Sequence, residues 1–347
     1  MKLLPANFGI LVIVACSLLL VIIGCKEQNS APIQPTPFTL EVPSHFPNPI
    51  YQTERNPFTR EGFLLGKKIF HDTRLSRTQT ISCASCHRQL HAFADGNQSV
   101  STGIEGKTGK RNAPAIFNMA WNPYFMWDGG VNHIEVMPLA PLLNDTEMGE
   151  TVVSILQKLR SDTSYVRMFN DAFHRDTIDD QQFFYALAQY MSHIISADSR
   201  YDQYIRKEID FSASEQRGLL LFRQYCASCH TEPLFTDYSL RNNGLYLVYP
   251  DSGHYRVSRK PGDIGKFKVP TLRNIAVTDP YMHDGSIASL EDVIAHYTQN
   301  IKPHPNLDSL LKQGGKIGFS LTQDEKDDLM NFLLTLTDSN LLKNPVF

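Results

Sequence analysis

Two copies of one pentapeptide hold the residues of this sequence that are best suited to chemistry. Each copy reads Cys-Ala-Ser-Cys-His, and the copies occupy residues 83–87 and 226–230. Two thiols at this spacing can add across the two vinyl groups of a porphyrin, and the histidine that follows can then bind the iron. The pattern predicts two covalently attached c-type haems, with the attachment residues Cys83, Cys86 and His87, and Cys226, Cys229 and His230.

Paired cysteines also occur in redox disulfides and in zinc sites. A thioredoxin-like pair is expected in a βαβ context and needs no following histidine. A zinc site would combine both pairs and leave the histidine after each pair unexplained. The other two of the six cysteines, Cys16 and Cys25, lie near the N-terminus. No cysteine is then left for a structural disulfide.

The first residues of the chain predict export. Lys2 precedes an apolar run from Phe8 to Ile23, which is shorter than the roughly 20 residues that a membrane span prefers and is typical of a secretory signal. The run ends at Gly24 and Cys25, a pattern that resembles a bacterial lipobox. We interpret residues 1–24 as a lipoprotein signal peptide and Cys25 as the lipidated residue, with an uncleaved membrane anchor as the alternative. Both interpretations, the lipoprotein signal and the uncleaved anchor, place the rest of the chain outside the cytoplasm, on the periplasmic side of a bacterial membrane.

The remaining chain divides into a spacer and two halves. Residues 25–57 are rich in proline and polar residues and predict a Pro-rich tether. One pentapeptide lies in each half of the chain beyond this spacer, which predicts haem domains at residues 58–205 and 206–347; a chain of 347 residues is long enough for two domains. The net charge of −3 gives no reason to propose nucleic acid as a partner.

The elements that must position these residues are expected to be mainly helical. Ser212 and Glu215 form a capping box at the start of a helix that leads into the second pentapeptide, and residues 63–70 have a helical apolar pattern before the first. Further helices are expected at residues 151–161, 179–205, 290–297 and 322–336. Few segments alternate with period two, so strands should be few, and residues 94–114 and 236–270 are expected to be long loops.

A series of short motifs surrounds the two pentapeptides. In the first half the motifs are Leu65-Gly66-Lys67-Lys68-Ile69-Phe70, Arg74-Leu75-Ser76, Phe93-Ala94-Asp95-Gly96, Arg111-Asn112-Ala113-Pro114, Trp127-Asp128-Gly129-Gly130 and Glu147-Met148. In the second half they are Pro270-Thr271-Leu272-Arg273-Asn274-Ile275 and Pro280-Tyr281-Met282-His283-Asp284-Gly285. From about Phe63 to about Thr337 the sequence therefore resembles the bacterial dihaem cytochrome c peroxidase family, which includes the MauG-type enzymes. The resemblance implies two mainly helical cytochrome c-like domains that face each other, with a peroxidatic N-terminal haem and an electron-transfer C-terminal haem.

The resemblance also implies roles at the first haem. Glu147 would take a proton from bound peroxide and return it to the leaving oxygen, with Met148 beside it; a solvated loop carboxylate is the alternative. Ile104 stands where many family members have a distal histidine that blocks the iron, so we expect an open or water-filled sixth position. His91 follows His87 too closely to reach the opposite face of the haem, and we expect it to be a hydrogen-bonding loop residue.

At the second haem, Tyr297 matches the position of the sixth iron ligand. Many family peroxidases have a methionine there, whereas MauG-type enzymes have a tyrosine, whose oxygen stabilises ferric iron. Met282 and His296 are alternative ligands, and ordinary helix packing is the alternative role for Tyr297. Trp127 matches the family tryptophan that lies between the haems and can relay an electron, although a buried tryptophan is more often a core residue.

An inter-domain calcium site is also implied by the resemblance. Its ligands would be the side chain of Asn112 and the backbone carbonyls of Thr278 and Pro280, and oxygen donors of this kind suit Ca²⁺. Backbone ligands leave almost no trace in a sequence, so the chain itself adds little to this expectation. The cofactors expected are therefore two c-type haems and one Ca²⁺.

Three functions are compatible with these residues. The main prediction is a peroxidase that reduces hydrogen peroxide to water with electrons from a small cytochrome c or cupredoxin. The alternative is a MauG-like oxidase that modifies residues of a partner protein, and Ile104 and Tyr297 favour it. The third is a non-enzymatic, lipid-anchored electron carrier, against which Glu147 and the missing distal histidine count. The sequence is compatible with a homodimer.

Overall fold

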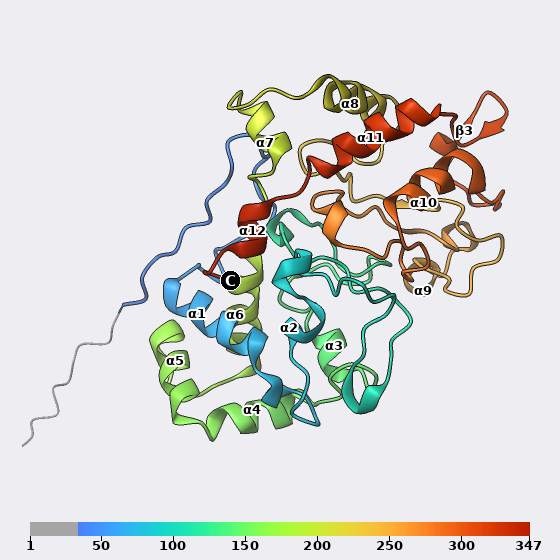
Figure 1. Cartoon of the computed structure of the whole chain (residues 1–347). Coiled ribbons are helices and arrows are strands. Elements are labelled where there is room, and N and C mark those ends of the chain that lie inside the picture. Colours follow the sequence, from blue (N-terminus) through green and yellow to red (C-terminus); the bar gives the residue numbers. More distant parts are fainter. Residues whose placement is uncertain (1–33) are drawn as a thin grey trace, which may run out of the picture. The chain divides into compact units, whose positions relative to one another are not determined.

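Helices and long loops make up most of the described chain, which is residues 34–347 of the computed structural model (Figure 1). The predicted signal peptide and Cys25 lie outside the described residues. The α-helices are α1 Arg60–His71, α2 Cys83–Cys86, α3 Leu139–Leu143, α4 Val152–Arg160, α5 Thr163–Phe173, α6 Asp180–Ser192, α7 Arg200–Ile205, α8 Ala213–Tyr225, α9 Tyr255–Ser258, α10 Leu290–Ala295, α11 Gln323–Leu334 and α12 Ser339–Lys343. The predicted mainly helical fold is confirmed.

The remaining elements are short. Single 3₁₀ turns occur at η1 Thr73–Leu75, η2 Gln89–His91, η3 Ile104–Gly106, η4 Met119–Trp121, η5 Pro261–Asp263, η6 Ile275–Val277 and η8 Ser309–Leu311, and η7 His296–Asn300 is a π-helix. The strands of the described chain form two antiparallel pairs, β1 Leu240–Arg241 with β2 Phe267–Lys268, and β3 Lys312–Gln313 with β4 Lys316–Ile317. Strands are therefore few, as the sequence predicted.

The first half is built on the crossing of α1 and α6. Thr59 caps α1, because its hydroxyl accepts a hydrogen bond of 3.0 Å from the amide of Gly62. One turn later Gly66 lies so close to the carbonyl of Ala186 in α6 that a Cβ atom at this position would overlap with it. The glycine thus lets the two backbones approach closely. The core around this crossing includes Phe70, Phe93 and Tyr190.

The second half repeats this arrangement with α8 and α11. The predicted capping box of Ser212 and Glu215 is present at the start of α8. Gly218 lies against the carbonyl of Asp328 in α11, and again a Cβ atom would overlap with it. A separate hydrophobic core surrounds this crossing and includes Phe222, Phe235 and Phe332. In both halves, the glycine-bearing helix precedes a haem motif.

The prediction of a single helix at residues 179–205 is wrong, because the chain leaves helical geometry between α6 and α7. The amides in this break are bound by side chains from elsewhere in the fold. Asn118 accepts from the amide of Ser196 at 2.9 Å, and Asp338 accepts from the amides of Ala197 and Asp198 at 2.9 and 3.1 Å. Since these side chains satisfy the backbone donors, the segment does not need helical hydrogen bonds.

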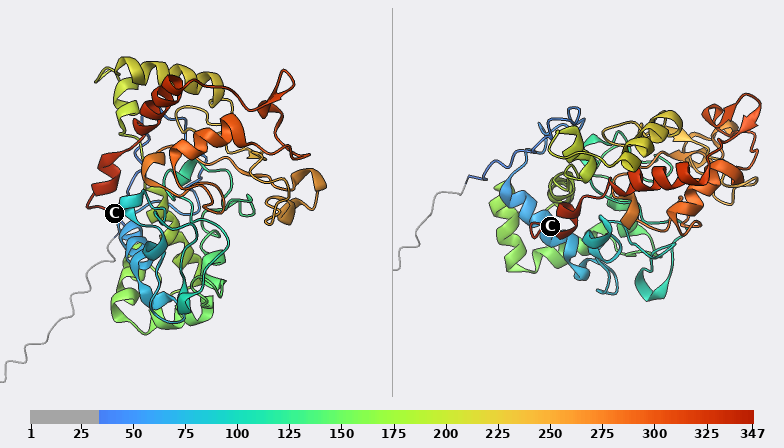
Figure 2. Two further views of the ribbon diagram at one scale, coloured as in Figure 1. Left: turned by 45° about the vertical axis from the view of Figure 1, so that its right-hand side comes forward. Right: turned by 45° about the horizontal axis from the view of Figure 1, so that its top comes forward.

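The described part of the segment predicted as a tether packs against the rest of the protein. The indole of Trp121 donates a hydrogen bond of 2.8 Å to the carbonyl of Pro47. His45 binds the buried carboxylate of Asp202 at 2.8 Å. At the other end of the chain, α12 returns to the first half, and the ring of Phe347 lies 6.3 Å from that of Phe63 (Figures 1 and 2).

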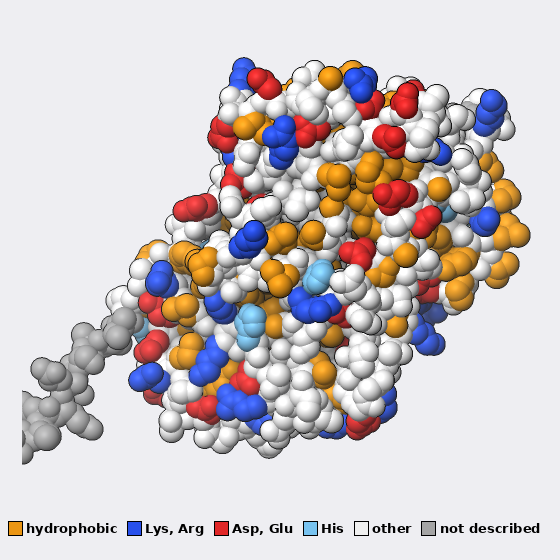
Figure 3. Space-filling view, viewed as in Figure 1, with side chains coloured by type: hydrophobic (Ala, Val, Ile, Leu, Met, Phe, Trp, Pro, Cys, Tyr) orange, Lys and Arg blue, Asp and Glu red, His pale blue; other side chains and the backbone are white. Residues whose placement is uncertain are grey.

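The surface of the described chain carries mixed charges. On the face shown in Figure 3, basic and acidic side chains are interspersed, while hydrophobic side chains gather mainly over the second half. Exposed apolar residues of the second half include Leu247, Val248 and Val257. Among residues 34–347, no helix has both the length and the apolar character needed to cross a membrane.

Candidate functional site

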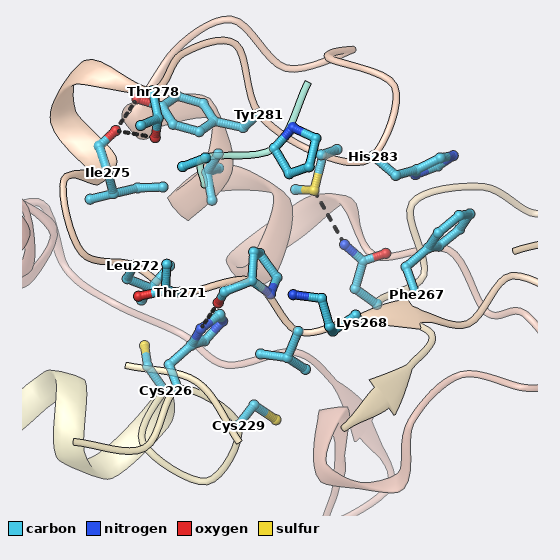
Figure 4. A pocket seen from close by; sticks show the side chains of 18 of the residues that line it. Cys226, Cys229, Phe267, Lys268, Thr271, Leu272, Ile275, Thr278, Tyr281 and His283 are labelled. Atoms are coloured by element: carbon cyan, nitrogen blue, oxygen red, sulfur yellow. Dashed lines mark hydrogen bonds between the residues drawn. The ribbon is translucent and has the colours of Figure 1, made fainter. Parts of the chain in front are cut away.

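The second pentapeptide lies at a cavity that residues of both halves line, most of them from the second half (Figure 4). Cys226, Cys229 and His230 follow α8 and line this cavity. The two thiols are free, and burial raises the pKa of Cys226 to about 12. The Nδ1 atom of His230 lies 3.1 Å from the carbonyl of Pro270 and 3.2 Å from that of Phe235. These contacts orient the ring and leave Nε2 as the atom available to a metal.

The first pentapeptide has the same local chemistry. Cys83 and Cys86 are free thiols at the ends of α2, and the Nδ1 atom of His87 lies 2.8 Å from the carbonyl of Phe93. Burial lowers the pKa of His87, which favours the neutral imidazole that binds iron. Phe93 and Phe235, which supply these carbonyls in the two halves, both have left-handed backbone conformations, with φ values of 60° and 55°. Both motifs therefore fit a covalent haem whose histidine is oriented by a backbone carbonyl.

Tyr297 lines the cavity of the second motif, as does Met282, whereas His296 does not. Instead, Nε2 of His296 lies 3.1 Å from the carbonyl of Asn243. Tyr297 lies in the π-helix η7, a rare conformation that is frequent at functional sites. Burial raises the pKa of Tyr297 to about 12, an effect that a hydrogen bond from Asn243 opposes. The fold thus brings Tyr297 and His230 to one cavity.

Glu147 lies in the loop between α3 and α4. Asn144 donates a hydrogen bond of 2.7 Å to its carboxylate, and the amide of Ile104 donates one of 2.9 Å to its backbone carbonyl. Burial raises the pKa of Glu147, whereas the bond from Asn144 lowers it, and the net direction is upward. The pKa of Cys86 is raised mainly by burial and further by the nearby carboxylates of Asp95 and Glu147. Glu147 therefore lies close enough to Cys86 for its negative charge to raise the pKa of that thiol.

The residues expected at the distal side of the first haem have distinct environments. Ile104 is fully buried, and Met148 is 4% exposed. Gly149 adjoins Ile104, since a Cβ atom on this glycine would lie 2.5 Å from the Cδ1 atom of Ile104. His91 lies with its Nδ1 atom 3.2 Å from the carbonyl of Val277. This contact fits the expected hydrogen-bonding role of His91.

Trp127 joins the two halves. Its indole donates a hydrogen bond of 2.8 Å to the carbonyl of Asn112, and its own carbonyl accepts one of 2.7 Å from the amide of Lys268. Trp127 also lines the cavity that contains His230. Trp127 is therefore bonded to both halves of the chain and borders the cavity of the second motif.

The three residues expected to bind calcium border the same cavity: Asn112, Thr278 and Pro280. The side-chain nitrogen of Asn112 donates to the carbonyls of Gln98 and Ser99 at 3.2 and 3.3 Å, so its Oδ1 atom is the one available to a cation. The donors are neutral oxygens, which Ca²⁺ accepts. Within residues 34–347, no cluster of three His, Cys, Asp or Glu side chains suits a metal.

Lys268 was missed by the sequence interpretation, which assigned it to a long loop. It forms part of β2 and lines the cavity of the second motif. The signal in the sequence was a lysine between two apolar residues, Phe267 and Val269, with Pro270 next along the chain. A lysine in such a run is either exposed at the edge of a sheet or directed toward a negatively charged group inside the protein. The sequence does not distinguish these two cases.

Several known proteins resemble this chain in sequence and in fold. The family profile described as di-haem cytochrome c peroxidase matches residues 60–210. The chain is 31% identical over 310 residues to the methylamine utilization protein MauG of Methylophilus methylotrophus, a match covering 87% of this chain and 88% of that protein. It is 32% identical over 236 residues to the cytochrome c551 peroxidase of Nitrosomonas europaea, covering 66% and 70%. A solved structure of a MauG-like protein associated with microbial copper homeostasis matches with a TM-score of 0.82 and 34% identity, covering 89% of this chain and 98% of that one.

Proposed function

The chain belongs to the dihaem cytochrome c peroxidase and MauG family, and from this membership we propose that it is a peroxidase with two c-type haems. It reduces hydrogen peroxide to water with electrons from a small redox protein. The observation that carries this function is the pair of haem motifs in one chain, with Glu147 close enough to the first of them to raise the pKa of Cys86. The haems supply the iron that binds peroxide and the store of electrons that reduces it.

Glu147 is the proton-transferring residue of this proposal. Burial raises its pKa, and a carboxyl group with a raised pKa is better suited to returning a proton that it has accepted. Asn144 holds the carboxylate by one oxygen, Oε1, and leaves Oε2 available to the substrate. One hydrogen bond from the amide of Ile104 and the close approach of Gly103 fix the backbone of this loop. Peroxide bound at the first haem would meet a preorganised acid–base group.

Cys226 and Cys229 would hold the second haem, with His230 as one iron ligand, and this haem would supply the electron-transfer chemistry. Tyr297 is proposed as the other ligand, and its position at the cavity of His230 supports this role. Trp127 would be the residue through which an electron passes between the haems, and its hydrogen bonds to Asn112 and to Lys268 in β2 support this role. A calcium ion bound by Asn112, Thr278 and Pro280 would stabilise the junction of the two haem domains.

A MauG-like oxidase is the second candidate. It would use the same haems to oxidise residues of a partner protein. The specific observation in its favour is Ile104, a buried aliphatic side chain that cannot bind iron. Tyr297, an oxygen ligand rather than a methionine sulfur, favours it as well. The 31% identity to a MauG protein agrees with this candidate, while the 32% identity to a cytochrome c551 peroxidase agrees with the first.

We further propose that the protein is exported and held at a membrane by lipid on Cys25. This rests on the basic, apolar and small residues at the start of the sequence. The mature protein would then act on the periplasmic side, where covalent haem attachment and a soluble electron donor are both available. Metabolic labelling with a fatty-acid analogue tests the anchor, and Cys25→Ser should abolish the label while leaving two haems per chain.

Peroxide turnover tests the main proposal. The purified diferric protein is mixed with one equivalent of hydrogen peroxide without prior reduction, and the haem spectrum is followed. Immediate reaction, followed by steady consumption of peroxide when a reduced small cytochrome c is added, is expected. Reaction with peroxide but no consumption of reduced donor would favour the oxidase. No reaction in either state would contradict both enzymatic functions and favour an electron carrier.

A further inference from the structure

Three basic side chains border the cavity of the second haem motif: Arg241, Lys268 and Arg273. The two arginines already have carboxylate partners. Arg241 binds Asp308 at 3.0 Å, and the fully buried Arg273 holds Asp202 with two hydrogen bonds of 2.7 and 2.8 Å. Their positive charges are therefore neutralised within the protein.

Lys268 has no such partner among residues 34–347. Its side chain extends into the cavity that contains Cys226 and Cys229 (Figure 4), and its Nζ atom lies 5.7 Å from the centre of the Tyr238 ring. No ion pair or hydrogen bond of its ammonium group accompanies this contact within the described chain. Burial lowers the pKa of Lys268 to about 8, and no carboxylate opposes this effect. Lys268 is half-buried, and its ammonium group faces the cavity without a partner in the described chain, so an anion bound there would stabilise it, because a partly desolvated charge is costly when unpaired.

The haem that the motif predicts carries such anions. A c-type haem keeps two propionate groups, and an ammonium group binds a carboxylate with a short, charge-assisted hydrogen bond. We propose that Lys268 is the cationic partner of a propionate group of the second haem. This inference rests on haem attachment at Cys226 and Cys229, and it adds a binding residue to that site.

The backbone holds Lys268 in place for this role. Lys268 pairs with Leu240 between β1 and β2, and its amide donates a hydrogen bond of 2.7 Å to the carbonyl of Trp127. The backbone of Lys268 is thus fixed to the tryptophan proposed to relay electrons, while its side chain borders the cavity of the second motif. A cation beside a haem disfavours the more positive ferric state, so it raises the reduction potential of that haem.

The test is the reduction potential of the second haem in Lys268→Met and Lys268→Arg, measured by a spectroelectrochemical titration of the holoprotein without peroxide. In Lys268→Met we expect the ratio of reduced to oxidised haem at a fixed potential to fall about tenfold, which is about 59 mV for a one-electron couple. The potential should also vary more with pH, because an unpaired propionate has a raised pKa. Lys268→Arg keeps the charge and should stay within about threefold of the wild type.

Lys266→Met is the matched control. Lys266 stands two residues away and pairs with Asp263 at 3.0 Å, so its loss removes the same charge without touching the cavity. Equal shifts in the two methionine variants, or a wild-type potential and pH dependence in Lys268→Met, would overturn the proposal. If Lys268→Met does not retain two haems per chain, Lys268→Gln is titrated instead and is judged by the same outcomes. Since no peroxide is used, a failure of the peroxidase assay leaves this result unaffected.

Discussion

The amide of Ile104 donates a hydrogen bond of 2.9 Å to the backbone carbonyl of Glu147. The residue expected to stand where many family members have a blocking histidine is therefore directly bonded to the proposed acid–base residue. Gly103, which precedes Ile104, lies so close to the backbone of Thr146 and Glu147 that it has no room for a side chain. The two loops form one unit beside the first haem motif, so substitutions in either loop can test its role.

Glu147→Gln should lower kcat/KM for hydrogen peroxide by about 10² to 10⁴, the usual contribution of a general acid–base group. Glutamine retains the side-chain oxygen that accepts from Asn144, so the loop should keep its structure. Stopped-flow mixing with peroxide gives the rate, and the haem spectrum verifies that both haems remain. Glu105→Gln, an exposed carboxylate that pairs with Lys107, is the control and should react like the wild type. An unchanged rate in Glu147→Gln would exclude Glu147 as the base.

The pH dependence of the same reaction is set by the pKa of Glu147. The carboxylate must be deprotonated to take a proton from peroxide, and burial raises its pKa. The rate should therefore fall as the pH is lowered, with a midpoint above the ordinary pKa of a glutamate. Glu147→Gln removes the titrating group, so its residual rate should lack this acidic limb. If the rate of Glu147→Gln still falls at the same low pH, the group that titrates is another residue.

Ile104→His should convert the first haem to a form that reacts with peroxide only after reduction. The wild type should show a high-spin EPR signal beside a low-spin one, because a buried isoleucine leaves the sixth position of the iron open. A histidine at this position can bind the iron, which would give two low-spin signals and no reaction in the diferric state. Ile104→Val removes one methylene and should keep the high-spin signal, at a cost of about 0.5–1.5 kcal/mol in stability. Two low-spin signals in the wild type would instead mean that another residue binds the iron.

Tyr297→Phe should change the spectrum of the second haem and leave that of the first unchanged. Loss of an anionic oxygen ligand removes a stabiliser of ferric iron, so the potential of this haem should rise. EPR and a redox titration measure the two effects. Tyr225→Phe, which also alters a tyrosine at the cavity, is the control and should leave the low-spin signal as it is. An unaltered signal in Tyr297→Phe would return Met282 to consideration, since that sulfur also borders the cavity.

The sequence predicted the parts of the site that depend on local spacing. The two pentapeptides and the capping box at Ser212 have short-range signatures, and the helical character of the fold follows from apolar periodicity. Contacts between distant segments could not be predicted in this way. The break after α6 depends on Asn118 and Asp338, which lie far from it in the sequence. The inward orientation of Lys268 depends on a strand pair of two residues, too short to produce an alternating pattern.

Gly218→Ala should destabilise the second half through the crossing of α8 and α11. A Cβ atom there would overlap with the carbonyl of Asp328, and a backbone atom cannot rotate away as a side chain can. The two helices must therefore separate, at a cost of about 1–3 kcal/mol by analogy with overpacked cores. Chemical unfolding of the haem-loaded protein measures this cost. Gly109→Ala is the control, because a Cβ atom at that glycine has nothing within 4 Å. Because α8 leads directly into Cys226, Gly218→Ala should also carry less of the second haem. If Gly218→Ala and Gly109→Ala unfold with the same free energy, the crossing of α8 and α11 can relax around the added methyl group.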